Sequence, residues 1–245
     1  MFRLGIQAFL GFLLLAGTAL QATPVAKTGD MTQAVGRLAQ AELSYNRAEL
    51  QQSIDLFSRL TRETPRNAEY PYYLARAYFP MITLYEVSGD TSKAESIGEQ
   101  GMEFAREAIR RDVNGNPDAY RLLGDYYGRL TNFKSIFGRM EYGGKSQKQH
   151  AKALEMDPKS MLAVIGVGTD KLLAPAGFGG DVDAAIQLFS KASQMSPESA
   201  IPLVWLARAY AKQGKPALAH STLQRALQLQ PGSAFVKNEL EHPKA

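Results

Sequence analysis

A hexapeptide that occurs twice in nearly identical form constrains this chain more than any other feature of its sequence. It reads YLARAY from Tyr73 and WLARAY from Trp205, which is 132 residues later. Looser copies keep a small residue followed three positions later by Tyr or Thr. These pairs are Ala75 and Tyr78, Gly124 and Tyr127, Gly166 and Thr169, and Ala207 and Tyr210. The spacing is helical, with the small residue where a neighbouring helix approaches closely, so each copy predicts one packing helix.

A second pattern follows these helices: a small residue, a larger one four positions later, another at seven and Pro at twelve. The copies are Ser53, Phe57, Leu60 and Pro65, then Ala185, Phe189, Ala192 and Pro197, and lastly Ala219, Leu223, Ala226 and Pro231. Ser146, His150, Ala153 and Pro158 share this spacing but place a polar residue in the larger position. Gly101, Ala105 and Ala108 follow the pattern with the proline displaced to Pro117. The sequence therefore predicts five helix pairs and a short terminal helix over residues 233–241.

The prolines mark the boundaries between these predicted helices. Proline cannot continue a helix, but its fixed φ suits the first turn of the next one. Pro117, Pro158 and Pro197 each stand just ahead of a predicted helix, and the residues before them, Asn116, Asp157 and Ser196, are predicted to cap it with a side-chain oxygen.

The alternation of small–large–Tyr helices with Ala–Phe–Ala–Pro helices resembles the tetratricopeptide repeat. The resemblance covers residues 31–231 and implies an all-α fold, a right-handed superhelical solenoid of antiparallel helix pairs with enlarged middle units. The predicted organisation is a signal peptide at 1–22, a linker at 23–30, the repeat domain at 31–241 and a tail at 242–245. The motif is specific for the fold and carries almost no information about the ligand.

The three middle units depart from the regular spacing at one joint. From the helix-A Tyr to the first small residue of helix B is nine residues in the last unit, Tyr210 to Ala219, and the middle units exceed this by 14, 10 and 7 residues. The first insertion is explained by both helices growing by about two turns. The second, LTNFKSIFGRMEYGGKS, is predicted to be a basic and aromatic loop, and the third is LLAPAGFGGD. The three insertions should share one rim of the array.

Two sets of residues are candidates for binding. The rim supplies Phe79, Tyr85, Phe133, Phe137, Arg139 and Phe178. In the tetratricopeptide family the concave groove is lined by helix-A residues that do not pack, which implies Tyr72, Arg76, Arg121, Asp125 and Arg208 here. The alternative for the rim is that these loops only fill space with their own apolar residues. The Lys and Asn set with which some members of the family clamp a peptide carboxylate is absent at matching positions.

The sequence offers few residues in arrangements that suit catalysis or metal binding. The chain has no cysteine, and its three histidines fall on separate predicted elements. The segment GVGTDK from Gly166 lies inside a predicted helix, and close helix packing explains it better than a phosphate loop does. We therefore expect no enzyme, no cofactor and no metal site. The formal charge of +4 is too mild to indicate a nucleic-acid partner.

The first 22 residues carry Arg3, the apolar run AFLGFLLLAGTAL and small residues around Ala19 and Ala22. This pattern predicts a signal peptide and therefore a periplasmic or extracellular protein, with an uncleaved membrane anchor as the alternative. The later segment from Arg129 to Lys152 has six basic residues and one Glu, which suits a solvated face or a contact for an acidic partner or anionic lipid headgroups.

Two functions remain open from the sequence. The first is an adaptor or scaffold that binds a protein or peptide partner in the groove. The second is a small-molecule or lipid-binding module, because exported repeat proteins of this kind resemble the accessory component of some tripartite periplasmic transporters, with the insert at 172–181 carrying that resemblance. A rim pocket lined by the aromatic candidates would favour the second function, and a solid rim would favour the first.

Overall fold

The computed structural model describes residues 28–241, so the predicted signal peptide, most of the linker and the tail lie outside the described residues. Every regular element in that range is helical, which confirms the all-α prediction. The helices are α1 (Thr28–Ser44), α2 (Arg47–Glu63), α3 (Glu69–Val87), α4 (Thr91–Arg111), α5 (Pro117–Leu130), α6 (Ile136–Met156), α7 (Met161–Leu173), α8 (Val182–Met195), α9 (Ile201–Lys212), α10 (Pro216–Leu229) and α11 (Ala234–Glu241), with short 3-10 helices η1 (Thr131–Phe133) and η2 (Ala176–Phe178).

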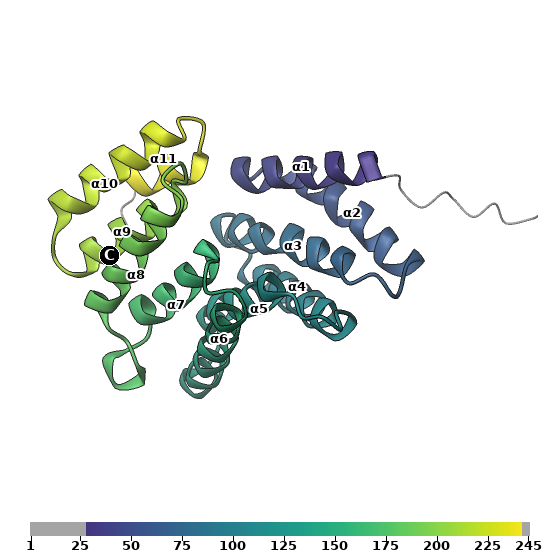
Figure 1. The fold of residues 1–245 in the computed structure, drawn as a ribbon, viewed down its shortest axis with the longest axis horizontal. Coiled ribbons are helices and arrows are strands. Elements are labelled where there is room, and N and C mark those ends of the chain that lie inside the picture. Colours follow the sequence, from purple (N-terminus) through teal and green to yellow (C-terminus); the bar gives the residue numbers. More distant parts are fainter. Residues whose placement is uncertain (1–27, 242–245) are drawn as a thin grey trace, which may run out of the picture.

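Consecutive helices pack as the five predicted pairs, α1 with α2 through α9 with α10, and α11 follows as a single terminal helix. The first helices also contact one another directly, α1 with α3, α3 with α5, α5 with α7 and α7 with α9. Figure 1 shows the pairs following a curve, so that α11 at the end of the chain reaches α1 at its beginning, and these two helices are in contact. No helix within residues 28–241 is long and apolar enough to cross a membrane.

The repeated positions form the core, as the spacing predicts. The larger position of the second helices is filled by Phe57, Phe189 and Leu223, all buried, and the small residues Ala75 and Ala207 are buried beside them. The phenol of Tyr126 is buried and donates a hydrogen bond to the carbonyl oxygen of Ala75 at 2.6 Å, which ties α5 to α3. These contacts position the first helices side by side along the inner face of the curve.

The first insertion is helical growth, as predicted. Helices α3 and α4 have 19 and 21 residues, whereas α9 and α10 have 12 and 14. Each helix of the early pair is thus longer by seven residues, which is two turns. The third insertion contains η2 and a left-handed turn at Gly179, and Asp181 caps α8 by accepting from the amide of Ala184.

The prediction of a loop for the second insertion is wrong. Only residues 131–135 lie between α5 and α6, and the remaining residues form the first turns of α6, a helix of 21 residues. Ser135 caps the helix by accepting from the amide of Gly138, and Lys134 ties this start to α4 through Glu95 and Glu99. The three glycines at 138, 143 and 144 lower helix propensity, and these contacts override it.

The prediction of helix caps is correct at one proline and wrong at two. Asn116 accepts from the amides of Asp118 and Ala119 at the start of α5, with Pro117 in its first turn. Asp157 and Ser196 instead stand at the C-terminal ends of α6 and α8. The reason is that a short turn containing the proline separates each from the next helix, which begins at Met161 or Ile201.

Candidate functional site

A line of alternating tyrosine, arginine and carboxylate side chains runs along the inner face of the first helices. It begins with Arg76 on α3, whose Nε donates to Glu42 Oε1 at 3.0 Å and whose Nη2 donates to Glu42 Oε2 at 2.5 Å. This bidentate ion pair joins α3 to α1. The guanidinium also lies 5.8 Å from the centre of the Tyr72 ring, within reach of a cation–π contact. The pair fixes both side chains at a surface that is partly open to solvent.

The line continues on α5 with Arg121 and Asp125. These two residues are one turn apart and form an ion pair, and Arg121 also lies within 4.0 Å of Asp118. The phenol of Tyr72 lies next to Arg121, and burial raises the pKa of Tyr72 and keeps the phenol neutral. We call the five residues Glu42, Tyr72, Arg76, Arg121 and Asp125 the inner ladder. It crosses three successive helix pairs.

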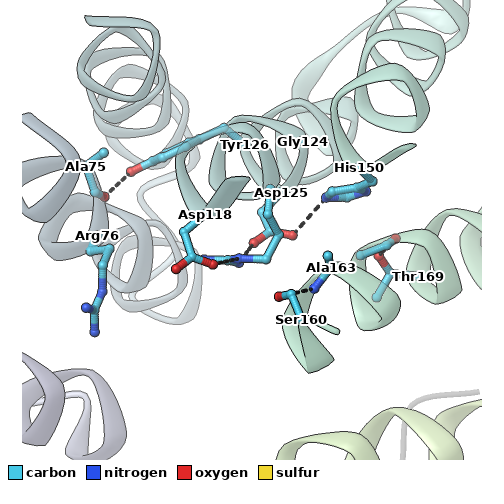
Figure 2. Close-up of polar contacts among 12 residues, drawn as sticks. Ala75, Arg76, Asp118, Gly124, Asp125, Tyr126, His150, Ser160, Ala163 and Thr169 are labelled. Carbon is cyan, nitrogen blue, oxygen red and sulfur yellow. Dashed lines mark hydrogen bonds and ion pairs between the residues drawn. The ribbon is translucent and has the colours of Figure 1, made fainter. Parts of the chain in front are cut away.

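Behind the inner ladder lies a buried histidine between two carboxylates. His150 on α6 is 1% exposed. Its Nε2 is 3.1 Å from Asp125 Oδ1, and its Nδ1 is 2.8 Å from Oδ2 of Asp170 on α7. Figure 2 shows Asp125 facing the His150 ring from α5, with Asp118 and Arg76 further along the same face. Ser146 completes the cluster by donating to Asp170 Oδ1 at 2.8 Å.

This environment keeps the histidine charged. Burial alone would lower the pKa of His150, but hydrogen bonds and Coulombic attraction from Asp125 and Asp170 outweigh it and raise the pKa to about 9. Burial by itself would raise the pKa of the Asp125 carboxyl. The attraction of Arg121 and the hydrogen bond from His150 outweigh burial and lower this pKa. Both ring nitrogens therefore donate, and the cluster is an ion network joining α5, α6 and α7.

Two glycines make room for the imidazole ring. A Cβ on Gly124 would lie 2.3 Å from His150 Cδ2, and a Cβ on Gly166 would lie 2.7 Å from the same atom. The close helix packing predicted for Gly124 and for the GVGTDK segment is thus present, with a histidine as the neighbour. The repeat spacing predicts His150 at the larger position but does not predict its contacts with Asp125 and Asp170. A polar residue in a position that is apolar in three other copies was the available signal.

The other predicted inner residue, Arg208, lies at the far end of the curve. Its Nε donates to Glu239 Oε2 at 2.8 Å and its guanidinium stacks 4.5 Å from the centre of the Trp205 ring. Glu239 belongs to α11 and is buried. Arg208 therefore holds the terminal helix in place.

The six rim candidates divide into packed and exposed residues. Phe79 packs edge-on against Tyr126, with 5.1 Å between the ring centres. The guanidinium of Arg47 lies 4.5 Å from the centre of the Tyr85 ring, and Phe133 is partly buried against the core. Phe137, Arg139 and Phe178 are exposed. Two depressions among the described residues, one beside α2 and α4 and one between α4 and Tyr142 of α6, contain none of these six. The rim is thus solid at its base and exposed at its outer edge.

Side chains that could hold a metal are not gathered within residues 28–241, where no group of three histidine or acidic residues has that arrangement. The inner ladder instead gathers tyrosine, arginine and carboxylate side chains on one face. Its tyrosine and arginine side chains are the residue types that carry most binding energy at protein interfaces.

Comparison with known proteins agrees with this architecture. A sequence profile described as tetratricopeptide repeat matches residues 179–237. The crystal structure of TTC0263, a thermophilic TPR protein of Thermus thermophilus, superimposes with a TM-score of 0.66, at 17% identity, over 85% of this chain and 97% of that one. A human IFIT1 dimer with PPP-AAAA gives 0.51, at 17% identity, over 81% of this chain and 41% of that one. At such identities the likeness establishes the fold.

The chain is a repeat protein of the tetratricopeptide superfamily. More narrowly, the profile described as regulator of microtubule dynamics protein 1-3 matches residues 37–169, more than half of the chain, and the chain belongs to that family. Among curated proteins no significant match was found.

Proposed function

We propose that this protein is an exported, non-catalytic scaffold that holds a segment of a partner protein along the inner ladder. The observation that carries the proposal is the continuity of the ladder over α1, α3 and α5, with side chains fixed by the pairs Arg76–Glu42 and Arg121–Asp125. Side chains that are already ordered lose little conformational entropy when a partner binds.

The charge pattern of the ladder indicates the kind of segment that fits. Each arginine is neutralised by a carboxylate, so a strongly acidic peptide would compete with Glu42 and Asp125 for the same donors. A segment with both donors and acceptors, and with apolar groups to lie against Tyr72, complements the surface better. We therefore propose a polar, uncharged or mixed-charge segment as the bound element.

The predicted signal peptide indicates the compartment of the partner. The apolar run and small residues of the first 22 residues are the pattern of a signal peptide, and we propose a partner in the periplasm or outside the cell. The family description concerns regulation of microtubule dynamics in the proteins for which it was given. Microtubules are accordingly one defined partner to test beside proteins of the cell envelope.

The small-molecule or lipid-binding accessory function has weaker support. The sequence criterion for it was a rim pocket lined by aromatic side chains. Phe79 and Phe133 pack against the core, and the depression between α4 and α6 has Tyr142 as its one aromatic side chain, among polar residues such as Glu99 and Arg106. A solid rim base supports the scaffold.

Affinity capture from the cell envelope with a matched pair of variants tests the proposal. Glu42→Ala combined with Arg76→Ala removes one rung without leaving an unpaired charge, and Tyr72→Ser removes the aromatic surface. Arg225→Ala, at an exposed position on the second helix α10, is the control. We expect both ladder variants to keep the helical circular-dichroism signal and to lose at least about tenfold in recovery of the partner, roughly 1.4 kcal/mol.

Three results would each contradict a part of this proposal. Ladder variants that recover the same proteins as wild type would move the binding surface elsewhere. Co-sedimentation with purified microtubules at micromolar concentration would argue for a cytoskeletal partner, and a small molecule released by denaturing wild-type protein, identified by mass spectrometry, would favour the accessory function.

A further inference from the structure

The start of α6 carries a cluster of exposed apolar side chains. Ile136 is 72% exposed, Phe137 80% and Met140 48%. They stand at positions i, i+1 and i+4, so they share one face of the helix. Arg139 is exposed beside them. We call these four residues the α6 tip. Large apolar side chains exposed singly are ordinary on a protein surface, but a cluster of them marks a contact site.

The charges around the α6 tip leave unneutralised cations. Lys134 is bound by Glu95 and Glu99, and Lys145 is bound by Glu141. Arg139 donates to the carbonyl oxygen of Lys134 at 3.1 Å. Across the described part of the chain, neither Arg139 nor Lys148 forms an ion pair with a carboxylate. Arg139, which stands next to the apolar side chains, is therefore available to an anion, and Lys148 is a second such cation about two turns further along α6.

The size and composition of the α6 tip distinguish between possible occupants. Stable interfaces between two protein copies bury about 800 Å² on each partner, which is well above what three apolar side chains supply. A few apolar residues flanked by basic ones are sufficient for a segment that lies in the headgroup region of a membrane. The side chain of Arg139 is long enough to keep its charge at the phosphates while its stem lies along apolar groups.

We propose that the α6 tip docks on the surface of a bilayer that contains anionic lipids. Ile136, Phe137 and Met140 enter the boundary between headgroups and acyl chains, and Arg139 and Lys148 contact the lipid phosphates. This contact goes beyond the proposed scaffold function, because it uses the second helix α6, whereas the inner ladder lies on α1, α3 and α5. The protein can therefore bind its partner while it is held at the membrane.

The absence of cysteine from the chain allows a site-specific test. Gly144 is exposed, lies one turn after Met140 on the same face, and has no atom within 4 Å of an added Cβ. Gly144→Cys can therefore carry an environment-sensitive fluorophore without disturbing the apolar residues. Val113→Cys, 94% exposed between α4 and α5, is the matched control. Since the label reports local contact, the full chain can be used whether or not its first residues also bind lipid.

We expect vesicles of phosphatidylcholine and phosphatidylglycerol to shift the emission of the label at 144 to shorter wavelength, and brominated lipids to quench it, with no change at 113. Phe137→Ser together with Ile136→Ser in the labelled protein should abolish the shift. Arg139→Glu should weaken the vesicle titration by about tenfold or more, as should high salt.

Equal responses at positions 144 and 113 would overturn the proposal. So would a full shift on vesicles of phosphatidylcholine alone that Arg139→Glu leaves unchanged. A shift that appears without vesicles as protein concentration rises would assign the α6 tip to a second copy, and a shift with a captured protein partner alone would assign it to that partner.

Discussion

The imidazole of His150 and the carboxylate of Asp170 join two helices through the interior of the array, with Nδ1 2.8 Å from Oδ2. In three other copies of the repeat the position of His150 holds Phe57, Phe189 or Leu223, all buried. An apolar core contact has been replaced in this one unit by an ion network. Such a network is costly to bury, and its members depend on one another for compensation.

Removing one partner of this network should destabilise the protein strongly. Asp170→Ala leaves Nδ1 of the charged His150 without its acceptor, while Nε2 keeps Asp125, and we expect a loss of about 3 to 5 kcal/mol in the free energy of unfolding, measured by urea denaturation. Asp55→Ala, at an exposed position on α2, should change it by less than about 0.5 kcal/mol. Combining Asp170→Leu with His150→Leu should cost less than the sum of the single changes, and additive costs would show that the pair is not coupled.

The raised pKa of His150 predicts a dependence of stability on pH. Its pKa is raised from 6.5 to about 9, so the folded state binds the proton more tightly than the unfolded state. The stabilisation is fully present below pH 6.5 and is lost as the pH rises to about 9, with a total on the order of 3 kcal/mol. Thermal unfolding midpoints measured across this range should fall with rising pH. In His150→Gln this part of the slope should vanish, and an equal slope in both proteins would contradict the assignment.

Much of the fold could be predicted from the sequence because each repeat has small and large residues at fixed positions. Ala75 and Ala207 fix where helices approach, Phe57 and Phe189 fill the facing position, and these short-range patterns do not depend on distant contacts. The lengthening of α3 and α4 followed from counting residues between fixed points of the repeat. The five helix pairs were therefore predictable.

The errors arose where contacts between distant segments decide the outcome. The glycines of the second insertion predict a loop, but Lys134 bound to Glu95 and Glu99 helps to hold the start of α6 against α4. Likewise, Asp125 and Asp170 are 45 residues apart in the sequence, and nothing local shows that they meet at one histidine. The inner ladder was partly found, because family spacing gave four of its residues, and Glu42 was missed because it belongs to a neighbouring unit.

Replacement of Gly124 should disrupt the contact with His150. A Cβ there would lie 2.3 Å from the ring, so Gly124→Leu should cost about 1 to 3 kcal/mol or more by overpacking. Gly36, exposed within α1 with open space around its Cα, provides the matched control. Gly36→Leu should leave the urea midpoint unchanged or raise it slightly, since leucine favours helix more than glycine. Equal midpoints for Gly124→Leu and wild type would refute the packing argument.

Export predicts a shorter protein in its host. The apolar run and the small residues at Ala19 and Ala22 lie outside the described residues, and the expectation rests on sequence alone. Intact mass spectrometry of the protein recovered from the cell envelope should show a chain trimmed near Ala22. A full-length species in the membrane fraction would support the uncleaved anchor, and a full-length species in the cytoplasm would refute export.

The division of the rim into packed and exposed aromatics predicts a destabilising effect of substitution at Phe133 and almost none at Phe137. Phe133 packs against the core, so Phe133→Ala removes buried apolar surface and should cost about 1 to 3 kcal/mol, less than a fully buried phenylalanine because the ring is only partly covered. Phe137 is 80% exposed, so Phe137→Ala should change stability by less than about 0.5 kcal/mol. Urea denaturation of the two single variants, followed by circular dichroism, measures both effects. If Phe137→Ala destabilised the protein as much as Phe133→Ala, its side chain would be packed in solution and the α6 tip would lose its central contact residue.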